Sequence, residues 1–282
     1  MGNFTAIDLS KLPAPKVIEE LSYETIFQDI LSDFLTKNPN YSTLLESDPA
    51  MILLEVCAYR ELLLRNRINE AAKATMLAYA TGSDLENLAA SLGVQKLVGE
   101  TDDQLRQRVQ LAPEAFTNAG SIGAYTFHAL SASSDIKSVS VKSPDPGEVL
   151  VTILSKTGNG TASEELIDAV LEKLSEEDVR PLTDQVSVQS AGIVNYAVEA
   201  VITVYSGPSS AVVQTESLAA LNKFLSERHA IGQVSALSGI YDALHVDGVK
   251  KVHLISPTAD VVATDEQAVY CNNINVSIIV DE

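Results

Sequence analysis

The sequence has little of two kinds of residue that would narrow its function. Only two of its 282 residues are cysteines, Cys57 and Cys271, and they lie far apart. This number and spacing exclude a disulfide framework and a zinc motif, and they suit a reducing compartment. Lysine and arginine number 19 against 38 aspartates and glutamates, so the net charge is −19. Because nucleic acids and anionic membranes bind basic surfaces, we expect neither as a partner.

Motifs for catalysis and cofactor binding are also missing. The sequence contains no GxxxxGK[ST], no GxGxxG after a strand and no HExxH. Gly158-Asn159-Gly160 precedes a predicted helix and could offer amides to an anion, but a turn with an N-cap is the more ordinary interpretation. His128 and His245 are expected at the carboxyl ends of their helices, where a cation is favourable. We predict no catalytic residues, no cofactor and no metal site; an enzyme with a site assembled from distant residues stays an alternative.

The amino terminus indicates neither secretion nor lipidation. MGNFTAIDLSKLPAPK lacks the apolar core of a signal peptide, and it fails the myristoylation pattern. Pro13 and Pro15 with little periodicity predict an extended arm over residues 1–21. A membrane span is not expected either, because Glu55 and Arg60 interrupt the most apolar run of the chain.

Proline and glycine are both absent between Pro49 and Gly82, which indicates one long helix. Asp48 is a suitable N-cap, Pro49 is tolerated at the first helical position, and Gly82 is expected to end the helix. A helix over residues 48–80 would be roughly 45–50 Å long. Shorter helices are expected after Ser22, after the capping box Ser83–Glu86, and over 102–112, where Thr101–Gln104 forms a second capping box before Pro113.

The first half of the long helix is apolar around nearly its whole circumference. Such a helix is buried by other elements, either those of its own chain or those of a partner subunit. The other helices predicted within residues 22–112 have one apolar stripe each, so they cannot cover every face. We therefore expect a partner contact to include some of five side chains: Met51, Leu53, Leu54, Leu62 and Leu63.

The sequence changes character at Pro113, where glycine-rich turns and alternating apolar segments begin. The pattern over residues 113–192 predicts a helix, a hairpin, a helix and a strand. The pattern over 193–282 predicts a strand, two helices and then strands over 249–254, 268–270 and 274–280. IKSVSV and VKKVHL each follow an Ala-Leu helix end, which suggests a weak internal repeat. The predicted fold class is α+β: a helical region with a long central helix over 22–112, then two small related α/β modules.

Several stretches carry a resemblance to a known family. The longest are DPAMILLEVCAYRELLLRNRINEAAKATMLAYATGSDLENLAASLGV (48–94) and ETDDQLRQRVQLAPEAFTNAGSIGAYTFHALSAS (100–133). PGEVLVTILS, DVRPLTDQVSVQSA, ALHVDGVKKVHL and AVYCNNINV extend it over almost the whole chain. These stretches resemble the baseplate J-like family of contractile-tailed bacteriophages. The chain departs from the family in a short connection at residues 95–99 and in Lys96, where arginine is usual.

The resemblance implies a structural role without catalytic residues. It implies a subunit of the baseplate wedge, present in two copies per wedge and in contact with neighbouring wedge and hub proteins. The helical region would build the wedge core, and the two modules would join wedges into a ring around the central hub and spike, which supports sheath contraction. The expected location is the virion tail baseplate, reached after assembly in the host cytoplasm. The same role in a tailocin or a phage-derived injection device is the alternative.

Overall fold

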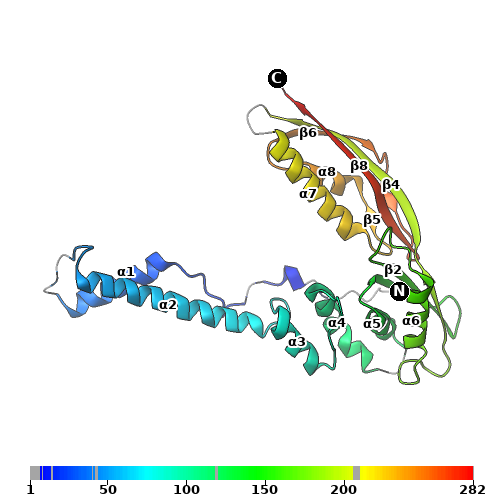
Figure 1. Ribbon diagram of the computed structural model, residues 1–282, viewed down its shortest axis with the longest axis horizontal. Coiled ribbons are helices and arrows are strands. Elements are labelled where there is room, and N and C mark those ends of the chain that lie inside the picture. Colours follow the sequence, from blue (N-terminus) through cyan, green and yellow to red (C-terminus); the bar gives the residue numbers. More distant parts are fainter. Residues whose placement is uncertain are drawn as a thin grey trace. The chain divides into compact units, whose positions relative to one another are not determined.

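The computed structural model describes residues 7, 9–13, 15–39, 41, 44–117, 120–205 and 210–281, with Ser10 by its backbone alone. It divides into two units, whose elements Figure 1 labels. The helical unit comprises Thr5–Lys96 and Thr101–Val109. The sheet unit comprises Met1–Phe4, Leu97–Glu100 and Gln110–Glu282. Each unit is described by itself below.

The helical unit follows the predicted order of helices. Its elements are η1 (Leu9–Lys11), α1 (Tyr23–Lys37), α2 (Pro49–Ala74), α3 (Gly82–Ser91) and the first part of α4 (Asp102–Ala115). The capping box at Thr101 is confirmed, because its hydroxyl accepts from the Gln104 amide at 3.4 Å and its amide donates to the Gln104 side chain at 3.2 Å. Helix α4 continues beyond the predicted end at Ala112 and includes Pro113. A proline in the last turn costs only the bond to the residue four before it, so two further residues stay helical.

The predicted length of the central helix was wrong at its carboxyl end. Helix α2 ends at Ala74, and residues 75–80 form turns in which the Ala80 amide donates to the Met76 carbonyl at 2.8 Å. The guanidinium of Arg106, on α4, donates from Nε to the Leu77 carbonyl and from Nη2 to the Ala80 carbonyl, both at 2.8 Å. A side chain from another helix therefore satisfies two carbonyls that a helix ending at Ala80 would have left without an intrahelical partner.

The predicted N-cap position of Asp48 is confirmed without its expected hydrogen bond, and the predicted cap of the next helix is wrong. Asp48 occupies the N-cap position of α2, but its carboxylate accepts from the Leu45 amide at 2.8 Å and from no amide of the first turn. Helix α3 begins at Gly82, before the expected capping box, and the Gly82 amide donates to the Asp102 carboxylate at 2.8 Å. Gly82 has a φ of 53°, a conformation that favours glycine, so it begins α3 instead of ending α2. A carboxylate distant in sequence thus caps α3 where Ser83 was expected to do so.

The first sheet of the sheet unit has the order β1-β2-β3. It contains β1 (Ile136–Lys142), β2 (Glu148–Ser155) and β3 (Gln185–Ser190), with helices α5 (Ile122–Ala132) and α6 (Glu164–Leu174). The predicted hairpin is confirmed, since β1 and β2 pair antiparallel, and β3 adds to β2 in parallel. Side chains of β2, α5 and α6, among them Val151, Tyr125 and Val170, form one buried core. His128 lies inside α5 and not at its end, and burial lowers its pKa, so the predicted cation at the helix terminus is wrong.

The second sheet has the order β6-β4-β8 and carries α7 and α8 on one face (Figure 1). Its elements are β4 (Gly192–Val204), α7 (Ser210–Arg228), α8 (Leu237–Leu244), β6 (Val249–Ser256) and β8 (Gln267–Val280). The short strands β5 (Val234–Ser235) and β7 (Val261–Val262), which the sequence did not predict, pair with each other. Strand β8 was expected as two pieces, but it is one strand, and its register along β4 shifts between Cys271 and Asn273. Such an irregularity bends a strand without ending it.

The α+β fold class is confirmed. The two sheets resemble each other in their strand pairing and in the order of part of their elements. Each sheet has one antiparallel and one parallel strand pair, and α5–β1 and α8–β6 share the helix, loop and strand order. The connectivity differs. Strand β2 pairs with β1, the strand directly before it in the sequence, whereas β8 pairs with β4, from which it is separated in the sequence by helices α7 and α8. Among the described residues no helix is both long and apolar enough to cross a membrane.

Candidate functional site

Helix α2 is covered on one side only within the helical unit. Helix α1 packs against it, and Ile26, Leu54 and Ala58 have exposed fractions of 5%, 9% and 0%. Further along, the side chain of Asn69 is buried and binds the backbone of Glu19 twice, as donor to its carbonyl at 2.8 Å and acceptor from its amide at 3.1 Å. These contacts fix which face of α2 points inward.

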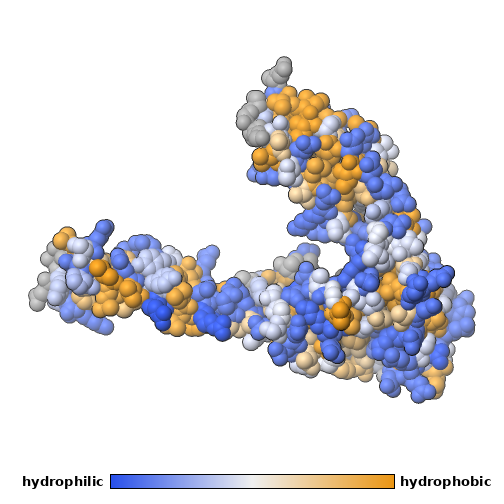
Figure 2. All heavy atoms as spheres, viewed as in Figure 1, coloured by the Kyte–Doolittle hydropathy of each residue, from blue (hydrophilic) through white to orange (hydrophobic). Residues whose placement is uncertain are grey.

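Away from α1, helix α2 exposes seven large apolar side chains to solvent. We call these seven side chains, whose exposed fractions run from 42% to 63%, the α2 apolar face: Ile52, Leu53, Val56, Tyr59, Leu63, Leu64 and Ile68. Figure 2 shows hydrophobic surface on this helix, broken by hydrophilic patches. Glu61 and Arg65 form an i,i+4 ion pair at 2.9 Å. An exposed apolar surface of this extent is typical of interaction sites in other proteins.

The structure separates the five residues that the sequence grouped together. Leu53 and Leu63 are exposed at 62% and 42% and belong to the α2 apolar face. Leu54 is buried at 9%, so it packs within the chain. Met51 and Leu62 are half-buried beside it. Only the first two are therefore open to a partner over much of their surface.

Five members of the α2 apolar face were missed by the sequence reasoning: Ile52, Val56, Tyr59, Leu64 and Ile68. A signal for some of them was present. Ile52, Val56, Tyr59 and Leu63 follow one another at steps of four, three and four residues, which places them on one helical stripe. The signal was hidden because the inward-facing positions of the same segment are also apolar.

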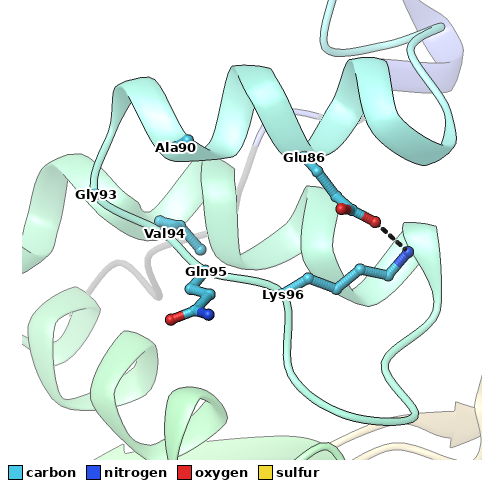
Figure 3. Close-up of a pocket in the computed structure, with 6 residues that line it drawn as sticks. All are labelled: Glu86, Ala90, Gly93, Val94, Gln95 and Lys96. Atoms are coloured by element: carbon cyan, nitrogen blue, oxygen red, sulfur yellow. Dashed lines mark ion pairs between the residues drawn. The ribbon is translucent and has the colours of Figure 1, made fainter.

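A second feature of the helical unit is a pocket of about 360 Å³ between α3 and the segment that follows it (Figure 3). Its lining consists of Glu86, Ala90, Gly93, Val94, Gln95 and Lys96. The Lys96 ammonium lies 3.2 Å from the Glu86 carboxylate and 2.9 Å from that of Asp102. The bond to Asp102 raises the pKa of Lys96, while the Gly82 amide and then Lys96 lower the pKa of Asp102. The charges of this pocket are thus paired with each other, and they join α3 to α4.

In the sheet unit, two titratable side chains, His229 and Lys137, meet near a loop. His229 Nε2 lies 3.1 Å from the Asn159 carbonyl and Nδ1 lies 3.2 Å from the Lys137 ammonium. Burial lowers the pKa of both side chains, and the charge of Lys137 further lowers that of His229. In the neutral tautomer that fits these contacts, Nε2 donates to Asn159 and Nδ1 accepts from Lys137. The loop Gly158–Gly160 therefore serves as a turn that receives His229, and the N-cap of α6 is Ser163.

The side chains with reactive atoms do not assemble into a recognisable reaction centre. Burial raises the pKa of the Cys271 thiol, which makes a thiolate less available. Cys57 is exposed on α2 and has no resolved disulfide partner in the described chain. Within the described residues, no three histidine, cysteine, aspartate or glutamate side chains are grouped as a metal site would require.

Comparison with known proteins gives matches along most of the chain. The models of the baseplate J-like N-terminal, central and C-terminal domains match residues 46–103, 117–190 and 196–277. Baseplate protein J of Escherichia phage P2 is 40% identical over 96% of this chain and 97% of its own length.

One solved structure, the anti-feeding prophage baseplate, matches 89% of this chain at 11% identity with a TM-score of 0.32. This chain spans 53% of the matched chain, and the TM-score is too low for an inference. The three domain matches and the phage P2 relative are sufficient without it. The chain belongs to the baseplate J-like family, whose members are structural components of phage baseplates.

Proposed function

We propose that this chain is a wedge subunit of a contractile-tail baseplate and that the α2 apolar face is its contact with the wedge core. The observation that carries the proposal is the exposure of seven large apolar side chains along one helix. Burying a single leucine is worth roughly 1.5–3 kcal/mol, so a partner that covers several of them gains substantial binding free energy. The partner is a second copy of the chain or a neighbouring wedge protein.

The finer parts of the proposal follow the family resemblance. Each wedge holds two copies, and residues 22–112 form the helical domain that contacts the wedge core. The modules 113–192 and 193–282 join wedges into a ring around the hub and spike and support sheath contraction. Assembly takes place in the host cytoplasm before the protein reaches the virion. The relative named baseplate protein J supports this proposal through its near-complete coverage of the chain.

The contact can be tested by exchanging single leucines for glutamate and co-expressing the chain with the neighbouring wedge proteins. Leu53→Glu and Leu63→Glu lie on the α2 apolar face. Each is expected to abolish co-purification of the wedge proteins, because a carboxylate would be desolvated in the interface. The isolated variants should still unfold cooperatively, since both positions are exposed in the chain itself.

Leu54→Glu is the matched control, one residue away on the same helix. Leu54 is buried against α1, so this substitution should unfold the helical unit itself. If Leu53→Glu and Leu63→Glu also unfold the isolated chain, the helix is only this protein's own core. If both variants fold and still capture the wedge proteins, the contact lies elsewhere.

We also propose that the protein is not an enzyme and holds no cofactor or metal. The support is its family and the paired state of its clustered charges, such as Lys96 with Asp102. The purified protein is expected to retain no metal in stoichiometric amount and to show no hydrolase or transferase activity. Elemental analysis that finds one metal ion per chain would contradict this.

A further inference from the structure

Strand β8 forms one edge of the second sheet, and its outer edge is open. It pairs with β4 along its length, from Gln267 to Val280. In the part of the chain that the structure describes, the outer edge meets an isolated bridge between Ala268 and Ile231 and, at the Val276 carbonyl, the side chain of Gln214. Among the described strands, none pairs with this edge from Asn273 to Val280. Unpaired amides and carbonyls along such an edge are a template for another strand.

The groups that point to the open edge can be identified. The Asp281 amide donates to the Val204 carbonyl, so Asp281 faces β4. Because successive residues of a strand alternate in direction, the main-chain groups of Ile274, Val276, Ile278 and Val280 face outward. The contact from Gln214 Nε2 to the Val276 carbonyl at 3.2 Å, on the side away from β4, agrees with this assignment. That carbonyl keeps a second lone pair for another donor.

This edge lacks the usual features that prevent strand addition. Soluble proteins protect edge strands with charged residues, prolines or short length. Strand β8 is 14 residues long and contains neither a charged residue nor a proline. Its last part, INVSIIV over residues 274–280, is rich in β-branched residues. In a chain with a net charge of −19, a long uncharged edge of this kind indicates that a partner strand covers it.

We propose that β8 pairs antiparallel with β8 of a second copy of this chain, centred on Ser277. In that register Val276 faces Ile278 of the second copy, and Ile274 faces Val280. These are the residues whose main-chain groups point outward, so each pair forms hydrogen bonds in both directions. Ser277 lies opposite its own symmetry mate in a pair without hydrogen bonds between the backbones.

The sequence favours a second copy over an unrelated strand, because the outward-facing positions 274, 276, 278 and 280 are all β-branched and stay so when INVSIIV is reversed about Ser277; on the other face Asn275 would lie opposite Ile279. Reversal places β-branched residues opposite β-branched residues on the face toward the helices, and serine opposite serine on the other face. The carboxylate that follows β8 in the sequence, on Asp281, falls opposite Asn273, so it meets no like charge there. A two-fold axis through Ser277 would produce the closed, isologous contact that homodimers commonly use.

The inference names the surface through which the second module would meet another copy, and to that extent it rests on the proposed ring-joining role. It does not depend on the α2 apolar face. The two can therefore be separated by testing β8 pairing in a full-length chain that carries Leu53→Glu, in which the proposed wedge-core contact is absent.

The test is sedimentation equilibrium of the Leu53→Glu chain and of three variants of it, each with a different residue at position 277. Ser277 is exposed. The chain with Ser277 intact is expected to form a dimer. Ser277→Lys and Ser277→Glu should each weaken the dimer by at least about tenfold, because two like charges would face each other with Cα atoms about 4.5 Å apart. An equimolar mixture of the two variants should restore dimers, whereas the neutral Ser277→Gln should keep the original affinity within about threefold.

Hydrogen exchange supplies a second measurement on the same samples. The Val276 and Ile278 amides should exchange slowly in the dimer and rapidly in the Ser277→Lys variant, while the Ser277 amide, which faces β4, should stay protected in both. A monomer with Ser277 intact, or a Ser277→Lys dimer of unchanged affinity, would overturn the β8 proposal and leave the wedge-core proposal standing. If Leu53→Glu does not affect the capture of wedge proteins, only the wedge-core proposal is rejected.

Discussion

Replacement of Arg106 should destabilise the helical unit, because this side chain holds the turn between α2 and α3. Its guanidinium donates to the carbonyls of Leu77 and Ala80, both at 2.8 Å, and pairs with the Asp103 carboxylate at 2.6 Å. The Arg106 side chain is 16% exposed and Ala80 is 1% exposed, so water can replace these bonds only in part. The side chain is therefore a structural support of the unit.

The expected cost follows from the two bonds to carbonyls. A hydrogen bond from a charged group contributes about 1.5–3 kcal/mol, and partial access of water reduces the sum, so Arg106→Ala should cost about 3 kcal/mol. Arg106→Lys keeps the charge but can reach only one carbonyl, which should cost about 1.5 kcal/mol. Asp103 is 94% exposed, and Asp103→Ala should cost less than about 1 kcal/mol, as surface ion pairs generally do.

Urea denaturation of the full chain, followed by far-ultraviolet circular dichroism, measures these differences in the transition of the helical unit. Hydrogen exchange of residues 75–80 should accelerate in Arg106→Ala, because the turn loses its partner. Equal losses in Asp103→Ala and Arg106→Ala would show that the surface ion pair carries the stability. Slower exchange at residues 75–80 in Arg106→Ala would mean that α2 had lengthened and that Arg106 does not end it.

Two further predictions concern the sheet unit and the boundary before it. Burial, and then Lys137, lower the pKa of His229, so the contribution of this side chain to the free energy of unfolding is fully present above about pH 6.5 and lost as the pH falls toward the lowered pKa. Urea titrations at several pH values should show that the free energy of unfolding falls less steeply with acid in His229→Gln than in the unchanged chain. Some acid dependence should persist in this variant, because the pKa of His128 is also lowered. The same dependence on pH in both proteins would contradict the role of His229. Brief chymotrypsin treatment should cleave after Phe116, which is 71% exposed, and should leave a folded fragment that begins at residue 117. If the intact chain survives, or if the fragment unfolds, the boundary proposed near residue 113 is rejected.

Local sequence signals determined much of the secondary structure. The caps at Ser22 and Thr101 act within three residues of themselves, and both were predicted correctly. The hairpin of β1 and β2 is likewise set by a turn and by two adjacent alternating segments. Such features need no information about distant residues, because every partner lies in the next turn or strand. The proposed domain limits at 112/113 and 192/193 stay predictions.

The interface candidate shows where sequence reasoning was incomplete. Composition identified α2 as too apolar for its neighbours, but it placed buried Leu54 and exposed Leu53 in one group. The two differ by 100° around the helix axis, and only the position of α1 decides which of them faces inward. The stripe that begins at Ile52 can be found in the sequence. Whether it faces solvent is known only from the structure, in which Ile26 is buried against another side of α2.

The sequence by itself determined the family, the order of the longer helices and strands, and the apolar character of the central helix, but it did not indicate β5 and β7. Tertiary structure alone decided where that helix ends. The guanidinium that binds the Ala80 carbonyl in the turn after the helix belongs to Arg106, 26 residues further along the chain. Tertiary structure also decided that β8 pairs with β4 and leaves one edge open, and that Lys137 meets His229 across 92 residues. Local propensity depends on neighbours in the chain, whereas these features depend on groups that only folding brings within hydrogen-bond distance.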